Sequence, residues 1–296
     1  MNSIDIESKK FLGQPKNFVS IFNALLFDGQ QVLKPEYLKD ENSELVMNVS
    51  SKHVDIIKRY EDGTYLDLFV IESQSYVDPS MVARVMEYES VARMRYIRQN
   101  FKKHVPMHTR LPMILTVVLY VGESKWNAAK RLSELEIIHP GFEDMFNEFK
   151  LNLIELNTNH KYNTGEKATQ DFFDLLRMIY RKQILKEDLD REFNRDALYF
   201  AYVVTKNKEL LNIYQESEKG DVKVCRALDE MFEESTNKGI QMGIKQGIEQ
   251  GIERGVKNTQ IKIAINMLVR NDQTLEEISE IVGLDLDALK ELKKNI

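Results

Sequence analysis

The spacing of apolar residues over the first 184 positions predicts helices and strands in alternation. Helical spacing holds over residues 15–28 and 78–101, and a proline near the start of each stretch favours a helix there. The run 112–121 is almost entirely apolar, which is typical of a strand covered on both faces. Shorter patterns add strands at 44–49 and 150–156 and a helix at 167–183.

Two further extended runs flank Asp62-Gly63, a dipeptide that is typical of tight hairpin turns. A two-residue turn at this point would set Asp55 opposite Val70. Because side chains alternate along a strand, Glu72 and Gln74 would then share the sheet face of Asp55. Same-face neighbours on adjacent strands lie about 7–8 Å apart at the backbone, so the carboxylates of Asp55 and Glu72 could converge on one ion.

From residue 185 onward the pattern is helical, and it contains a glycine repeat. Glycine followed by isoleucine or valine recurs at every fourth position between Gly239 and Val256. Each glycine costs roughly 1 kcal/mol in a helix interior relative to alanine, so this helix requires another surface that buries its isoleucines. A second copy of the chain is the simplest partner, since symmetric dimers are the commonest oligomers. A flexible connector is the alternative.

The residues after the repeat predict a small helix-turn-helix. Thr274 and Glu277 have the spacing of a capping box, and Gly283 stands where two short helices would turn. The second helix carries Asp285 and Glu291, acids that would face phosphates in a DNA groove. Packing is therefore favoured over base recognition.

Together these patterns predict an α/β fold, with a mixed sheet flanked by helices and an all-helical C-terminal region. The expected segments are an α/β domain, a helical region, the glycine-isoleucine repeat helix and a helix-turn-helix-like tail, at residues 1–184, 185–236, 237–258 and 259–296.

Composition indicates the cellular compartment in which the protein is expected. The single cysteine, Cys225, excludes an intrachain disulfide framework and fits a reducing compartment. The first ten residues lack the apolar core of a secretory signal, and no apolar run is long enough to cross a bilayer. A cytoplasmic protein without a membrane partner is expected.

The charge distribution bears on nucleic-acid binding. The net charge of −6 argues against a nucleic-acid partner, but the stretch 93–110 contains no acid. The candidates for DNA contact in this stretch are Arg93, Arg95, Arg98, Lys102 and Lys103. Two interpretations remain open: a patch that meets a phosphate backbone, and a solvated helix face.

Several of these pieces occur in a fixed order: the apolar helix 18–29, the strand with Asp55, the tripeptide Glu72-Ser73-Gln74, the apolar run 111–122, Trp126 and the glycine-repeat tail. The ordered set resembles the Rpn (YhgA-like) recombination-promoting nucleases, also labelled transposases, over nearly the whole chain. The resemblance implies a PD-(D/E)XK restriction-endonuclease-like fold. It also implies a metal-dependent DNA endonuclease that promotes recombination.

For the site, the resemblance implies that Asp55 and Glu72 bind Mg²⁺ or Mn²⁺, ions that prefer hard oxygen ligands and activate water. Gln74 takes the position where the wider superfamily has lysine, so it can orient water but brings no charge. Relatives often carry an acid at the position of Ser20, which leaves Ser20 and Asn23 as auxiliary candidates. The alternative is a non-catalytic interaction protein, whose acids only pair with arginines and whose tail drives assembly.

Overall fold

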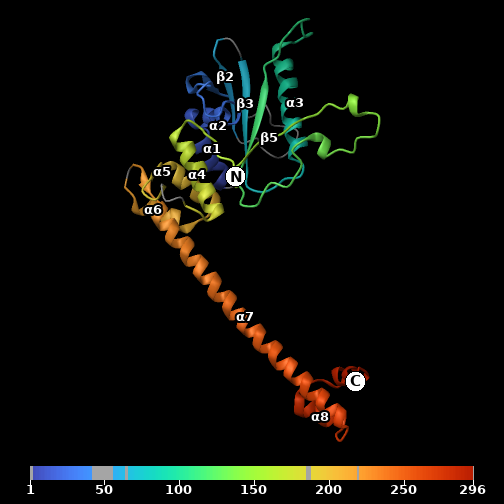
Figure 1. Ribbon diagram of the computed structural model, residues 1–296. Coiled ribbons are helices and arrows are strands. Elements are labelled where there is room, and N and C mark those ends of the chain that lie inside the picture. Colours follow the sequence, from blue (N-terminus) through green and yellow to red (C-terminus); the bar gives the residue numbers. More distant parts are fainter. Residues whose placement is uncertain (1–2, 42–55, 64–65, 185–187, 219, 296) are drawn as a thin grey trace. The chain divides into compact units, whose positions relative to one another are not determined.

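The computed structural model describes residues 3–41, 56–63, 66–184, 188–218 and 220–295 (Figure 1). The contacts divide the chain into two compact units, Met1–Asp229 and Glu230–Ile296. Each unit is described separately below.

Within its described residues, the first unit contains a five-stranded mixed sheet with the order β1-β2-β3-β4-β5 (Figure 1). The strands are β1 (Leu38–Asp40), β2 (Ile56–Glu61), β3 (Leu66–Gln74), β4 (Ile114–Tyr120) and β5 (Asn152–Glu155). The first three strands pair antiparallel, whereas β3–β4 and β4–β5 are parallel. The predicted α/β class and the strands near 112–121 and 150–156 are confirmed. The strand expected at 44–49 lies outside the described residues.

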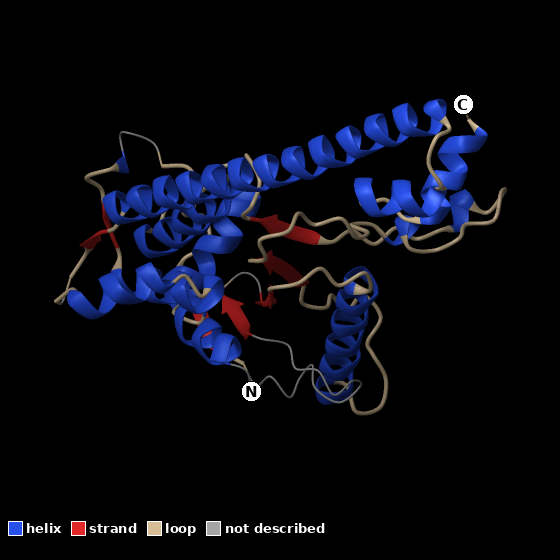
Figure 2. Ribbon diagram, turned by 90° about the horizontal axis from the view of Figure 1, so that it is seen from below, coloured by secondary structure: helices blue, strands red, loops and turns tan. Residues whose placement is uncertain are grey.

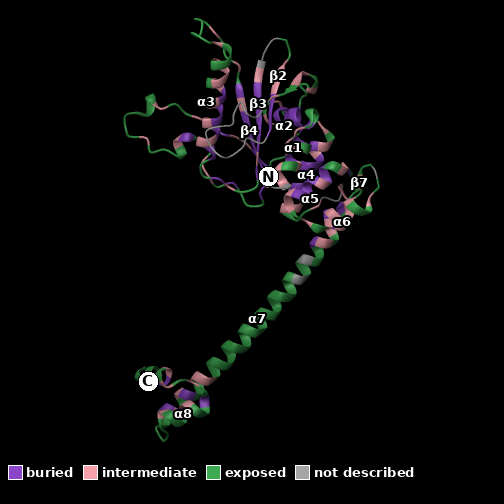
Figure 3. Cartoon of the chain, turned by 180° about the vertical axis from the view of Figure 1, so that it is seen from behind, coloured by how far each residue is buried: buried purple, intermediate pink, exposed green. Residues whose placement is uncertain are grey.

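Helices cover both faces of this sheet (Figure 2). The helices described up to residue 216 are α1 (Ser3–Leu12), α2 (Pro15–Phe27), α3 (Met81–Asn100), α4 (Lys167–Arg181), α5 (Arg195–Thr205) and α6 (Lys208–Glu216), with short 3₁₀ turns at Pro35–Tyr37, Leu132–Glu134 and Glu143–Met145. On one face, the ring of Phe22 from α2 packs 4.8 Å from the ring of Phe69. On the other, Tyr88 from α3 packs with Val70 and Ile57. The core therefore forms two apolar layers around the sheet, seen as the buried residues in Figure 3.

The hairpin between β2 and β3 corrects the predicted register. Ile57, rather than Asp55, lies opposite Val70, and the paired residues resume only after a four-residue connection, 62–65. A two-residue type I′ turn needs positive φ at both central positions. Gly63 has φ 89°, but Asp62 is not among the described residues with positive φ. Asp55 itself lies outside the described residues.

The region after residue 185 is helical, as predicted, apart from one short antiparallel ladder. Among the described residues there, β6 (Glu192–Phe193) pairs with β7 (Val222–Lys223). Two residues per strand are too few to produce an alternating pattern, so the sequence gives no signal for this ladder.

A long helix, α7 (Cys225–Arg270), leads into the second unit and runs without interruption across the expected segment boundaries at 236 and 258. It is followed by α8 (Leu275–Val282) and α9 (Leu286–Lys294). The end of α7 and these two helices share a small core around Leu268, Ile278 and Leu289. The predicted capping box at Thr274 and the turn at Gly283, which has φ 73°, are both present.

The glycine repeat lies on the surface of α7. Ile240, Ile244, Ile248 and Ile252 are 56–62% exposed. A Cβ atom added at any glycine of the repeat would meet no atom within 4 Å among the described residues. The apolar row that the sequence expects to be buried is therefore not covered by the described residues of its own unit.

Two loops interlock at the ends of α2 and α4. Asn163 Nδ2 donates to the carbonyl oxygen of Asp28 (3.1 Å), and Gln31 Nε2 donates to the carbonyl oxygen of Gly29 (2.9 Å). Gly29 (φ 81°) and Gly165 (φ 65°) have left-handed backbones that favour glycine. A Cβ atom at Gly29 would lie 2.5 Å from Asn163 Cγ, and one at Gly165 would lie 2.2 Å from Gln31 Nε2.

None of the helices in the described ranges is both long enough and apolar enough to cross a membrane.

Candidate functional site

Glu72 and Gln74 lie near the C-terminal end of β3, in the interior of the sheet. In the parallel ladder with β4, Glu72 is opposite Val118 and Gln74 is opposite Tyr120. Because side chains alternate along a strand, both polar groups project from the sheet face covered by α3. Glu72 is only 4% exposed and Gln74 only 5%, so both side chains are shielded from bulk solvent.

An arginine from α3 is the principal described partner of Glu72. Arg84 Nη2 donates to Glu72 Oε1 (2.9 Å), and Arg84 Nη1 donates to Asp78 Oδ2 (2.6 Å). The hydroxyl of Tyr88, one helical turn further along, accepts from Arg84 Nε (3.1 Å) and Nη2 (2.8 Å). One guanidinium group therefore joins two buried carboxylates and a phenol.

The local sequence explains how this cluster is assembled. Asp78 precedes α3, and its Oδ1 accepts from both the backbone N (2.9 Å) and the Oγ (2.6 Å) of Ser80. Burial opposes ionisation of Asp78, but the hydrogen bonds from Ser80 and Arg84 outweigh it and lower the pKa of this carboxyl. Burial also opposes the charge on Arg84, but hydrogen bonds to Asp78 and Tyr88 and the charge of Glu72 raise its pKa. The carboxylate of Asp78 and the guanidinium of Arg84 thus stabilise each other in their charged forms.

Gln74 presents a different chemistry. Its amide Nε2 is buried and makes no hydrogen bond to any described residue. Buried polar groups nearly always have a partner, so this donor is suited to a bound water or to an oxygen atom of a ligand. The side chain next to it on β4, Tyr120, is also buried, and burial raises the pKa of its hydroxyl.

Ser20 and Asn23, the auxiliary candidates, lie on the opposite side of the sheet. Both belong to α2, which packs against the face of Phe69 rather than the face of Glu72. Ser20 Oγ donates to the carbonyl oxygen of Asn17 (2.7 Å), and the Asn23 amide makes two hydrogen bonds of 2.9 Å with the backbone of Leu33. The structure does not bring either residue to Glu72.

The basic stretch lies at the other end of α3 from Arg84. Arg93 Nη2 donates to Glu89 (2.8 Å), whereas Arg98, Lys102 and Lys103 are exposed at the end of the helix and in the loop that follows. At about 1.5 Å per residue, Arg98 lies about 21 Å along the helix from Arg84. The predicted DNA contacts therefore lie on α3 or in the loop that follows it, and they are not adjacent to Glu72. Arg95 lies between the two ends of the stretch and is half-buried.

The donor set for a metal ion is incomplete in the described part of the chain. Among its residues, no group of three or more His, Cys, Asp or Glu could hold a metal ion. Glu72 offers the hard oxygen that Mg²⁺ or Mn²⁺ prefers, but its Oε1 accepts from Arg84. A divalent site would therefore require a second ligand such as Asp55 and the oxygen of Glu72 that does not contact Arg84.

The sequence patterns did not identify Arg84 or Asp78 as residues of this site. The available signal was Asp78 at the entry of a predicted helix, with Arg84 and Tyr88 spaced one turn apart inside it. That spacing predicts a shared helix face, but it does not indicate that Glu72 from a neighbouring strand meets it.

A mixed sheet with buried polar groups near the end of an interior strand defines an α/β protein of the kind expected from the sequence. The family model described as "Putative transposase, YhgA-like" matches residues 9–210, so the chain belongs to the YhgA-like transposase family. This finding confirms the resemblance and supports a role related to transposition or recombination. No curated protein and no solved structure matches the chain.

Proposed function

We propose that this protein is a metal-dependent DNA endonuclease that acts in recombination. In this proposal Asp55 and Glu72 bind Mg²⁺ or Mn²⁺, and Gln74 orients the attacking water or a phosphate oxygen. The observation that carries the proposal is the pairing of a buried carboxylate with a buried amide donor that has no described partner, two residues apart on one strand face. Membership of a transposase family supplies the link to DNA.

The chemistry assigned to each side chain follows from its charge and position. A bound divalent ion would supply the activation of water and the neutralisation of phosphate charge. Gln74 Nε2 can donate one hydrogen bond but adds no positive charge. Arg84 contacts Glu72 Oε1, which leaves the other carboxylate oxygen, Oε2, as the one that would face the metal ion. In this arrangement Glu72 would bridge the guanidinium group and the ion.

The basic stretch fits a duplex that follows α3. The separation of about 21 Å between Arg84 and Arg98 corresponds to about six base pairs at about 3.4 Å each. Arg98, Lys102 and Lys103 would then contact phosphates several base pairs from the cleavage position, which favours positioning of the DNA over direct participation in cleavage.

A second candidate function is a non-catalytic interaction protein in which the nuclease-like fold is only a scaffold. Two observations favour it: Glu72 forms an ion pair with Arg84, and the isoleucine row of α7 is exposed. The partner in this case is a second copy of the chain, since identical repeat helices offer matching glycine gaps and isoleucine rows.

Cleavage of supercoiled plasmid distinguishes the two functions. The wild-type chain is incubated with plasmid and Mg²⁺ or Mn²⁺, with and without EDTA, beside Glu72→Gln and the control Asp67→Asn. Asp67 lies on the same strand but on the other face, where it accepts a hydrogen bond from the backbone of Met113. Nicking that needs metal, is lost in Glu72→Gln and persists in Asp67→Asn supports the endonuclease. Intact plasmid under every condition contradicts it and leaves the interaction protein.

A further inference from the structure

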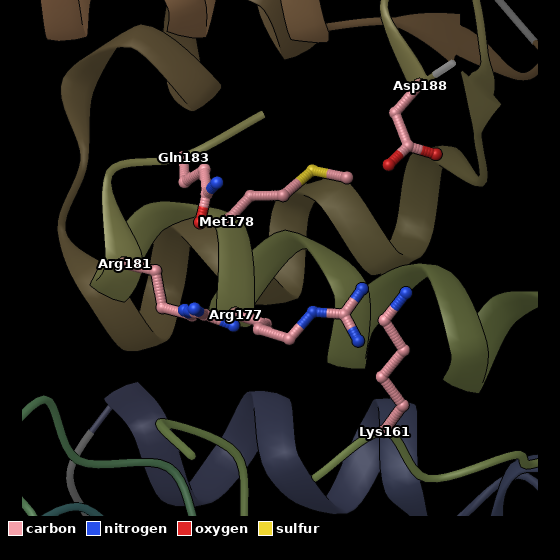
Figure 4. Close-up of a pocket in the computed structure, with 6 residues that line it drawn as sticks. All are labelled: Lys161, Arg177, Met178, Arg181, Gln183 and Asp188. Carbon is pink, nitrogen blue, oxygen red and sulfur yellow. The ribbon is translucent and has the colours of Figure 1, made fainter. Parts of the chain in front are cut away.

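A small pocket lies at the C-terminal end of α4 (Figure 4). Its volume is about 260 Å³, and it is lined by Lys161, Arg177, Met178, Arg181, Gln183 and Asp188. Three of these six side chains are cationic and one is acidic. The pocket is a separate feature from the Glu72 cluster, because α4 packs with α2 on the other side of the sheet, where Ser20 Oγ lies 2.8 Å from Thr169 Oγ1.

The cations converge from two elements. Arg177 and Arg181 are four residues apart on α4 and therefore lie on one helix face, an arrangement that is destabilising for like charges. Lys161 comes from the loop between β5 and α4, and Figure 4 shows its ammonium group pointing toward the guanidinium group of Arg177. The three cationic side chains therefore repel one another at this position in the fold.

The nearby acids do not neutralise all of these charges. Arg177 Nη2 lies 2.9 Å from Asp174 Oδ1, but the other oxygen of Asp174 accepts from Arg191 Nη1 (2.8 Å). Asp188 lies 3.6 Å from the same atom of Arg191. Among the described residues, Lys161 and Arg181 form no ion pair with any acid. The pocket therefore has an excess of positive charge that an anionic ligand would offset.

The arginine deepest in the pocket is held in place before any ligand binds. The Arg177 side chain is 13% exposed, and its contact with Asp174, itself 8% exposed, fixes the guanidinium group. An ordered guanidinium presents several N–H donors in a planar fork that matches the oxygen atoms of phosphate. The side chain of Met178 is buried and supplies an apolar wall.

The size of the pocket limits the ligand. Pockets for drug-sized molecules span about 300–1,000 Å³, and a water molecule occupies about 30 Å³. At about 260 Å³ the pocket accommodates a phosphate group with a few waters more readily than a whole nucleotide. A sugar and a base attached to that phosphate would lie outside it.

Hydrogen bonds link the helix that carries the pocket to the strand of Gln74. Tyr180, next to Arg181 on α4, donates a hydrogen bond to the carbonyl oxygen of Val121. The backbone N of Val121 in turn donates to the carbonyl oxygen of Gln74 (2.8 Å). The C-terminal part of α4, which also carries the pocket residues Arg177 and Arg181, is therefore connected through two hydrogen bonds to the end of the sheet where Glu72 and Gln74 lie.

We infer that Lys161, Arg177 and Arg181 form a binding site for a phosphate group of a nucleic acid. The inference stands independently of the metal-dependent cleavage proposed above, because it concerns binding at a separate pocket. The phosphate could be an internal phosphodiester of a strand or a terminal phosphate, and both share the oxyanion chemistry that the three cations recognise.

Calorimetric titration of the full chain with inorganic phosphate tests the site. The variant is Lys161→Gln with Arg181→Gln, which removes the two cations that have no ion-pair partner in the described part of the chain and leaves the Arg177–Asp174 contact intact. The control is Lys182→Gln, which removes one positive charge next to Arg181 at a residue that does not line the pocket. Because the double variant loses two charged hydrogen-bond donors, it is expected to bind phosphate at least about tenfold more weakly. Equal binding by the wild type and the double variant, or no binding by the wild type, overturns the inference.

Single-stranded oligonucleotides with and without a 5′ phosphate identify the source of the phosphate. If the pocket takes a terminal phosphate, the double variant loses affinity only for the phosphorylated strand. If it takes an internal phosphodiester, affinity falls for both strands and their salt dependence flattens equally. Unchanged affinity for both strands contradicts the site. Binding without cleavage keeps these outcomes distinct from any failure of the endonuclease proposal.

Discussion

The ion-pair cluster at Glu72 gives the sharpest test of how the buried charges are balanced. Replacing Arg84 by methionine keeps most of the apolar stem but removes the cation that contacts Glu72 and Asp78. The side chains of Arg84, Glu72 and Asp78 are only 14%, 5% and 10% exposed, so solvent screens the loss poorly. Breaking a buried pair by removing one partner costs about 3–5 kcal/mol, and we expect Arg84→Met to lose that much stability at pH 7.

The loss should depend on pH in a defined direction. In the wild type the pKa of Asp78 is lowered in the folded state, so its contribution is present above its unfolded pKa and disappears as the pH falls through the folded value. Without Arg84, Asp78 loses two of the causes that lower its pKa, while burial continues to raise it. The penalty of the variant is then relieved as Asp78 takes up a proton. The stabilities of the two proteins should converge as the pH falls toward and below about 4, where Asp78 of the wild type is protonated as well.

Urea unfolding followed by fluorescence measures this difference. Trp126 is the only tryptophan of the chain and packs in a cluster with Met81 and Val85 of α3, so it reports on this part of the first unit. Arg98→Met, at an exposed position of the same helix, is the control and should change stability by no more than about 0.5 kcal/mol. The double variant Arg84→Met with Glu72→Gln should lose less than Arg84→Met alone, because one of the two uncompensated charges is gone. A loss below about 1 kcal/mol, or one equal at pH 7 and pH 4, would refute the reasoning.

Three further predictions concern cleavage, DNA binding and assembly. Asp55→Ala and Glu72→Ala should each abolish plasmid cleavage while circular dichroism stays native, and full activity in either would remove the metal-ligand assignment. Arg95→Glu with Lys102→Glu should weaken DNA binding and flatten its dependence on salt, whereas an unchanged salt slope would indicate a merely solvated surface. The full chain should be a dimer by light scattering and a chain that ends at Thr236 a monomer, and a dimeric truncated chain would place the contact outside the repeat.

The parts of the fold that the sequence predicts well are those specified by neighbouring residues. Pro15 opens α2, and Asp28 ends it with a left-handed backbone at φ 51°. Thr274 and Glu277 form the capping box three residues apart, as their spacing indicates. The apolar run that forms β4 reflects burial on both sheet faces, since six of the seven residues of the strand are buried.

The predictions that were wrong or incomplete depend on contacts between segments that are distant in the sequence. The register of β2 against β3 shifted because Asp62 lacks the positive φ that a two-residue turn requires. Whether Ser20 shares a face with Glu72 depends on which side of the sheet α2 packs, and helical spacing carries no such information. Arg84 meets Glu72 only because α3 folds back over the sheet. The predicted pairing of Glu72 with Asp55 on the neighbouring strand stays untested, since Asp55 lies outside the described residues.

The interlocked loops around Gly29 and Gly165 restrict how this domain can vary in evolution. A side chain at Gly29 would displace Asn163, and a side chain at Gly165 would displace Gln31. A Cβ atom at Gly29 would also lie 2.7 Å from the backbone oxygen of Asn163, and one at Gly165 would lie 2.5 Å from the backbone oxygen of Gly29. No change of side chain in the other loop relieves these contacts, so relatives should keep glycine at both positions, although the loops lie more than 130 positions apart in the chain. A chimera that takes α2 and its following loop from one family member must also take residues 163–165 from the same source.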